Sequence, residues 1–124
     1  MRAGTILLYN CSGPEYSKLR QIFAMLRLRM RGVTPEQYNI PLGDLAEGKG
    51  GAATEAGEPI PETILLFCGL NEALLTQVLE VIRVAKIPPI QMKAVLTETN
   101  REWNSYQLIE ELRREKEELE KGQN

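Results

Sequence analysis

The sequence predicts a mixed α/β fold of the ferredoxin-like type, a split βαβ repeat (βαββαβ) with an added C-terminal helix. Two nearly identical apolar segments, Thr5–Tyr9 and Thr63–Phe67, have the length and composition of buried strands. A stretch of helical periodicity follows each of them, and a second strand-like segment follows each helix. The connection between the halves lacks a full helix, which favours antiparallel pairing there. A small doubly wound parallel sheet is the alternative.

The first half begins with the strand Thr5–Tyr9 and continues into a helix. Pro14 suits the first turn of that helix, because proline has no N–H to leave unpaired there. The apolar side chains that recur at helical spacing are Tyr16, Leu19, Ile22, Phe23 and Leu26. From Leu26 to Arg31 apolar and basic residues alternate strictly, which predicts a strand with one face in water.

The segment between the two halves has a different composition. Residues 43–61 are rich in glycine and proline, with scattered Glu and Ala. Such a composition is typical of loops. We therefore expect one α/β domain over residues 1–121 that contains a flexible Gly-rich loop at 43–61.

The second half repeats the pattern. After the strand Thr63–Phe67, Asn71 is placed to cap a helix that reaches about Lys86. The side chains expected to face inward are Leu74, Val78, Val81, Ile82 and Ala85. Residues 91–97 form the next predicted strand, with Met92, Ala94 and Leu96 on one face. Residues 92–95 match residues 30–33 in the first half.

A last helix is predicted to open at Asn104. Gln107 stands three residues later, the spacing of a capping box. Leu108, Ile109 and Leu112 would dock this helix. Residues 113–124 are almost entirely charged, so we expect a partly frayed helical tail there.

Composition excludes several kinds of site. The chain of 124 residues contains no histidine, the commonest general base and a common metal ligand. We therefore assign no catalytic residues, no metal and no cofactor. The N-terminal apolar run is too short for a secretory signal, and no run could cross a membrane. A cytoplasmic protein is the expectation.

Several segments together resemble a known family. They are Ile6-Leu7-Leu8-Tyr9-Asn10, Pro35-Glu36-Gln37-Tyr38-Asn39, Pro41-Leu42-Gly43, Ile87-Pro88-Pro89-Ile90, Lys93-Ala94-Val95-Leu96-Thr97, Thr99-Asn100 and Trp103. The chain resembles an uncharacterised bacterial family, the domain of unknown function 3783. The resemblance implies a small bacterial α/β protein with no established catalytic residues to carry over.

Polar residues cluster after two of the predicted strands, and they are the candidates for a ligand site. The candidates are Asn10, Ser12, Lys93, Thr97, Thr99, Asn100 and Trp103. If the strand ends converge, these side chains line a small-molecule pocket with an aromatic wall. Turn and capping chemistry is the alternative interpretation.

Arg27, Arg29 and Arg31 form a basic surface on one face of the second strand. Such a stripe could bind nucleic acid weakly. An edge strand protected from aggregation by charge is the interpretation we favour, and we do not expect nucleic acid as a partner.

Cys11 and Cys68 follow the two equivalent strands. A redox pair is one hypothesis for them. Two small buried apolar groups are the other, and the more usual in a cytosolic protein.

The sequence thus predicts a non-enzymatic domain that binds a small ligand or a protein partner. Because the two central strands are apolar on both faces, each face needs cover, and a homodimer is one way to provide it. An enzyme that uses Lys93 with nearby hydroxyls is the alternative.

Overall fold

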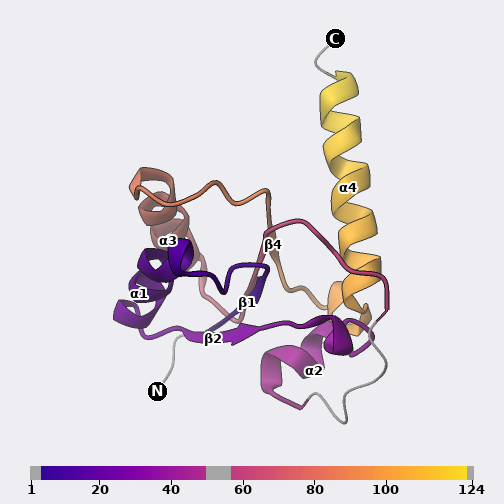
Figure 1. The fold of residues 1–124 in the computed structure, drawn as a ribbon, viewed down its shortest axis with the longest axis horizontal. Helices are drawn as coiled ribbons and strands as arrows, with labels where there is room; N and C mark the ends of the chain where they lie inside the picture. The colour runs from indigo at the N-terminus through magenta and orange to yellow at the C-terminus, as the bar shows by residue number, and fades with distance from the viewer. Residues whose placement is uncertain (1–3, 50–56, 123–124) are drawn as a thin grey trace. The chain divides into compact units, whose positions relative to one another are not determined.

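The computed structural model describes residues 4–49 and 57–122, and these divide between two compact units (Figure 1). The first unit comprises Met1–Thr34 and Pro61–Leu96. The second comprises Pro35–Ile60 and Thr97–Asn124.

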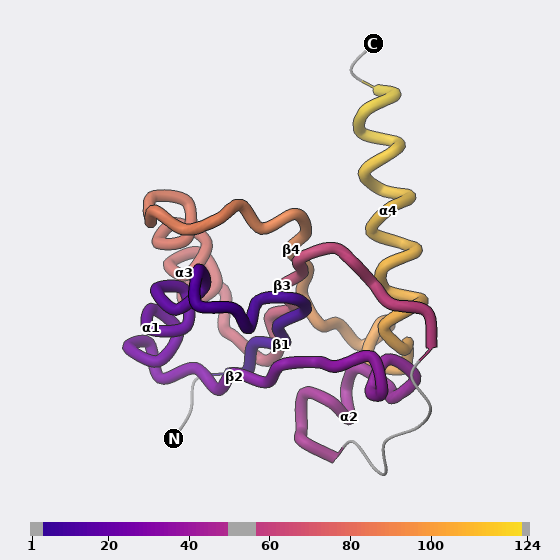
Figure 2. Tube along the Cα trace, viewed as in Figure 1, coloured from indigo at the N-terminus to yellow at the C-terminus, as the bar shows by residue number. Residues whose placement is uncertain are grey.

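The first unit contains a four-stranded mixed sheet in the order β2-β1-β3-β4 (Figure 2). Its strands are β1 (Thr5–Tyr9), β2 (Arg29–Gly32), β3 (Ile64–Cys68) and β4 (Met92–Val95). β1 and β2 are parallel neighbours, β3 and β4 are parallel neighbours, and β1 and β3 meet antiparallel in the centre.

This topology confirms the mixed α/β class and corrects its details. In the ferredoxin-like order, a strand of the other half separates the two parallel strands of each βαβ unit. Here the parallel strands are direct neighbours, so neither βαβ unit is split. The antiparallel centre also differs from a doubly wound parallel sheet. It agrees with the absence of a full helix between the halves.

Two helices, α1 (Ser17–Met25) and α3 (Glu72–Val84), cover one face of the sheet. The core between them and the sheet is formed by Ile6, Leu8, Cys11, Tyr16, Leu19, Phe23, Leu28, Leu65, Phe67, Val78 and Ile82. Val81 and Ala85, which were expected to face inward, are not part of it. Asn71 caps α3 as expected, because its side chain accepts a hydrogen bond of 2.8 Å from the Leu74 amide.

The positions that are equivalent in the two βαβ units differ by one residue from those that the sequence match aligns. That match aligns Leu7 with Leu65. In the sheet, however, Leu7 pairs with Leu66, while Leu65 pairs with Leu8 on the face that the helices cover. Since successive residues of a strand face opposite sides, Leu7 and Leu65 cannot be equivalent.

The equivalent positions are those that share a place in the core. Ile6 corresponds to Leu65, and Leu8 to Phe67. In the helices the same shift aligns Leu19 with Val78 and Phe23 with Ile82, and all four are buried. It also aligns Asn10 with Gly69, which follow their strands with φ of 62° and 76°. Asparagine is among the few non-glycine residues that adopt this left-handed conformation readily.

The second predicted strand is shorter than the alternation suggested. Leu26 and Arg27 form the turn that ends α1: the Leu26 amide donates to the Ile22 carbonyl at 3.1 Å, and Arg27 has a φ of 60°. β2 begins only at Arg29. Leu28 is nevertheless buried and Met30 packs against the core, as alternation predicts.

The second unit is helical. It contains the 3₁₀ turns η2 (Pro35–Gln37) and η3 (Asn100–Glu102) and the helices α2 (Leu42–Glu47) and α4 (Ser105–Gly122). The Leu42 amide bonds the Trp103 carbonyl at 2.8 Å, and the Ser105 amide bonds the Tyr38 carbonyl at 3.0 Å. Both bonds fasten the segment around α2 to the start of α4.

Three sequence predictions concern this part of the chain. Asn104 and Gln107 each accept a bond from the other's amide at 2.9 Å, so the capping box is confirmed. α4 is helical to Gly122, although its residues from 113 onward are exposed. The predicted loop at 43–61 begins inside α2, and its residues 50–56 lie outside the described part of the chain.

Candidate ligand-binding site

A hollow of about 450 Å³ lies in the first unit, beside the C-terminal half of α3 and strand β4. Its apolar lining consists of Leu79, Ile82, Ala85, Ile87, Pro88, Pro89 and Ile90. The other lining residues are two cations, Arg83 and Lys93. Small-molecule sites generally have volumes of roughly 300–1,000 Å³, and this one lies within that range.

Lys93 is placed here by the register of the sheet. It pairs with Leu65, so its side chain leaves β4 on the face that the helices cover. Its counterpart in the first half is Met30, which pairs with Ile6 and packs against the core. At this position of the sheet the second half therefore has a cationic side chain, Lys93, and the first half an apolar one, Met30.

The hollow depends on features that distinguish the second βαβ unit from the first. α3 has 13 residues and α1 has 9. The connection to β4 runs through residues 85–91, and the connection to β2 only through residues 26–28. Ile87 and Ile90 pack back against the core, so this longer connection forms a wall of the hollow.

A second difference concerns the outer face of the helix. In the first half, Arg20 donates hydrogen bonds from Nη1 to the carbonyls of Cys11 and Gly13, at 2.9 and 3.0 Å. Its counterpart in α3 is Leu79, which lines the hollow. The helix position whose side chain hydrogen-bonds a loop in the first half is therefore held in the second half by an apolar side chain that lines the hollow.

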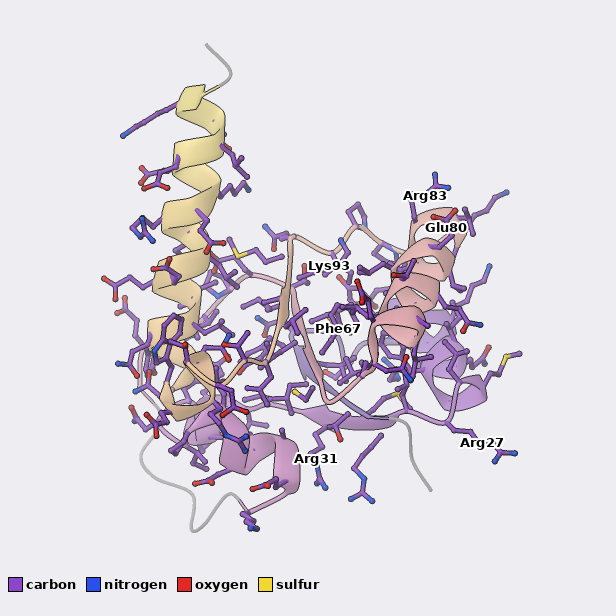
Figure 3. The ribbon with its side chains drawn as sticks, turned by 180° about the vertical axis from the view of Figure 1, so that it is seen from behind. Arg27, Arg31, Phe67, Glu80, Arg83 and Lys93 are labelled. Carbon is purple, nitrogen blue, oxygen red and sulfur yellow. The ribbon has the colours of Figure 1, made fainter. Side chains whose placement is uncertain are left out.

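The two cations of the hollow differ in their contacts (Figure 3). Arg83 forms an ion pair with Glu80 one turn earlier on α3, using Nε and Nη2. This pair lowers the pKa of Glu80 and raises that of Arg83. Lys93 is exposed, and its side chain forms no hydrogen bond or ion pair within residues 4–49 and 57–122.

A family model matches part of the chain. Residues 63–119 match the model of a family described as "Domain of unknown function (DUF3783)". Over this segment the chain is similar to the DUF3783 family. The family resemblance is thereby confirmed over residues 63–119, and that segment contains every residue that lines the hollow. No curated protein and no solved structure matches the chain.

Asn10 and Ser12, two of the predicted site residues, lie outside the DUF3783 segment. They follow the carboxyl end of β1. Because β1 runs antiparallel to β3 and therefore to β4, this end lies at the same edge of the sheet as the start of β4, with β3 between them. The sheet does not bring the carboxyl ends of β1 and β4 together. Asn10 Nδ2 donates to the Glu62 carbonyl at 2.7 Å, and Ser12 is exposed.

Thr97, Thr99, Asn100 and Trp103 belong to the second unit. Thr97 Oγ1 and Asn100 Oδ1 each accept a bond from the other residue's amide, at 3.1 and 2.8 Å. This is a reciprocal cap at the start of η3. Thr99 is exposed and Trp103 half-buried.

The predicted basic surface is divided by the end of α1. Arg29 and Arg31 lie on β2, whereas Arg27 lies in the left-handed turn that ends α1. Figure 3 shows Arg27 and Arg31 projecting from separate places. The prediction of three arginines on one strand face is therefore wrong for Arg27, because the strand begins at Arg29, three residues later than the alternation suggested.

The two cysteines are free and buried. Cys68 pairs with Thr5 at the start of β1, whereas Cys11 lies beyond the end of that strand. The length of β1, about 13 Å, therefore separates them, and a disulfide needs Cα atoms within roughly 7 Å. Burial raises the pKa of Cys11 to about 11 and that of Cys68 to about 12.

Two further kinds of site are not found among the described residues. In residues 4–49 and 57–122, no three Cys, Asp or Glu side chains are grouped to hold a metal ion. None of the helices in these ranges is long and apolar enough to span a bilayer.

Sequence reasoning identified Lys93 but missed the other residues of the hollow. The strand pattern suggested Met92, Ala94 and Leu96 as one face of the strand, without showing that a helix covers the other. A helix with an apolar residue off its buried stripe, Leu79, followed by a long Pro-Pro connection, is the signal that the sequence contained.

Proposed function

We propose that the protein is a non-enzymatic binding domain and that the hollow beside α3 and β4 is its small-ligand site. One observation carries the proposal: a hollow of about 450 Å³ has apolar walls and two cationic side chains that lie on different elements. Largely apolar cavities with a few polar groups are typical of small-molecule sites.

The alternative of lysine-based catalysis has less support. Lys93 lies in the hollow, but the residues that line it include no hydroxyl and no carboxylate. A nucleophilic lysine is activated by removal from water, whereas Lys93 is exposed. The nearby hydroxyls expected from the sequence, Thr97 and Thr99, belong to the other unit.

Nucleic-acid binding through the arginines is also less well supported. Arg27 is separated from Arg29 and Arg31, so the surface that would track a phosphate backbone is interrupted. The bacterial origin, the cytoplasmic location and the homodimer expected from the sequence remain part of this proposal. Light scattering after size-exclusion chromatography tests the homodimer through the mass of the particle.

The test of the site uses the fluorescence of 1-anilinonaphthalene-8-sulfonate, an apolar probe with one negative charge. Ala85→Phe places a large ring in the hollow, since Ala85 is part of its lining. Val84→Phe is the matched control, because Val84 is the adjacent residue, is 63% exposed and is not part of the lining. We expect the wild type and Val84→Phe to bind the probe and Ala85→Phe to bind it at least tenfold more weakly.

Two results would contradict the proposal. One is an absence of saturable probe binding by the wild type. The other is equal binding by Ala85→Phe and Val84→Phe, which would place the probe elsewhere. Far-UV circular dichroism of both variants shows whether they keep the fold.

A further inference from the structure

We infer that the ligand of this hollow is an amphiphilic anion, a small molecule with an apolar body and one carboxylate or similar charged group. The inference rests on the proposed function and specifies the chemical class of the ligand.

The charge of the lining supports a negative ligand. Both charged residues that line the hollow, Arg83 and Lys93, are cationic, and none of the lining residues is acidic. Lys86 lies between them in sequence, in the connection that leaves α3. A hollow lined by charges of one sign favours ligands of the opposite sign.

The two cations are not equivalent. Arg83 already binds Glu80 through Nε and Nη2, which leaves its Nη1 hydrogens outside that pair. Lys93 has no protein partner in the described part of the chain, and its ammonium offers three donors. Lys93 is therefore the principal contact for an anionic group, with Arg83 beside it.

The apolar walls specify the rest of the ligand. Leu79 on α3 and Ile87 and Ile90 on the connection face the same hollow as Lys93. A hydrophilic anion such as phosphate would leave these side chains in water. An apolar chain attached to the anion would cover them, and its burial adds favourable free energy in proportion to the area covered.

The position of Lys93 also supports a role beyond solubility. In the first βαβ unit the equivalent position holds Met30, which packs on the core. A methionine would therefore fit the fold at this place in the sheet. The second unit instead has a cation in the lining of a largely apolar hollow.

The experiment compares octanoate with 1-octanol, which have the same chain and differ in charge. Isothermal titration calorimetry is performed on the wild type, on Lys93→Met and on Lys18→Met. Lys18 is the control, because it is an exposed lysine of α1. We expect the wild type and Lys18→Met to bind octanoate more tightly than 1-octanol, and Lys93→Met to lose about tenfold in affinity for octanoate only.

The outcomes separate the two claims. If octanoate and 1-octanol bind the wild type equally, or if Lys93→Met binds octanoate as the wild type does, the inference of an anionic ligand is overturned while the site itself stands. If neither compound binds and the sulfonate probe also fails to bind, the proposed function is overturned together with the inference.

Discussion

Lys93 occupies in the second βαβ unit the position that Met30 occupies in the first. Each side chain leaves an edge strand on the face that the helices cover, opposite a buried residue of the neighbouring central strand. Met30 packs against the core, whereas Lys93 is exposed and lines the hollow. The difference between these two positions underlies the proposed ligand site.

Exchanging the two residues is expected to have unequal effects on stability. Lys93→Met should change the free energy of unfolding by no more than about 0.5 kcal/mol, because Lys93 is exposed and has no partner among residues 4–49 and 57–122. Met30→Lys should lower it by roughly 1–3 kcal/mol, because it places a charge against the core. Urea unfolding measures both. Equal losses would show that the two positions do not differ in this way.

The core beneath α1 and α3 should depend strongly on Phe67. Its side chain is buried, with 1% of its surface exposed. Phe67→Ala should lower the free energy of unfolding by about 3–5 kcal/mol, since it removes buried apolar surface and leaves a cavity. Met25→Ala is the control, because Met25 is 82% exposed at the end of α1. Similar urea midpoints for the two variants would contradict the assignment of the core.

The start of α3 should depend on the side-chain oxygen of Asn71. Asn71→Ala removes the bond to the Leu74 amide and should cost about 1 kcal/mol. Asn71→Asp keeps an acceptor at that position and should retain most of the stability. Thermal unfolding followed by circular dichroism compares the two variants. A loss as large for Asp as for Ala would show that the cap is not responsible.

Burial of the thiols predicts both their reactivity and a dependence of stability on pH. The pKa values of about 11 and 12 for Cys11 and Cys68 keep both thiols protonated at pH 8, so they should react with Ellman's reagent only after unfolding. Both values lie above the ordinary pKa of 9.0. The unfolded chain therefore loses these protons first as the pH rises.

It follows that the thiols contribute full stability below pH 9 and that this contribution is lost as the pH rises towards 11 to 12. The urea midpoint of the wild type should be lower at pH 10.5 than at pH 8. The difference should be smaller for the double variant Cys11→Ala, Cys68→Ala, which has no thiol to titrate. The same fall in both proteins would assign the pH dependence to other groups.

Much of the fold could be predicted from the sequence because its signals are local. The two central strands are continuous apolar runs, the helices have regular apolar spacing, and Asn71 and Asn104 precede helices that they do cap. Strand order is not a local property. Helical and strand periodicity are equally compatible with a split or an unsplit βαβ unit, so the sequence did not determine that β1 lies directly beside β2.

The candidate site was predictable only in part for the same reason. Lys93 was identified from its place in the last strand, but Asn10 and Ser12 were grouped with it on the assumption that the strand ends converge. Because β1 pairs antiparallel with β3, the end of β1 lies instead at the edge of the sheet where β4 begins. The apolar walls of the hollow come from residues that resemble ordinary helix and loop positions, and only their packing shows that they enclose a space.

The most direct test of the ligand site is a titration of ¹⁵N-labelled protein with octanoate, followed by two-dimensional ¹H–¹⁵N NMR. The account predicts that the largest shifts fall on the amides of Leu79, Arg83, Ile87, Ile90 and Lys93, which border the hollow. The amides of residues 10–13, after β1, should remain unchanged. Saturating shifts centred on residues 10–13, or no saturating shifts at all, would contradict the assignment of the ligand site to the hollow beside α3 and β4.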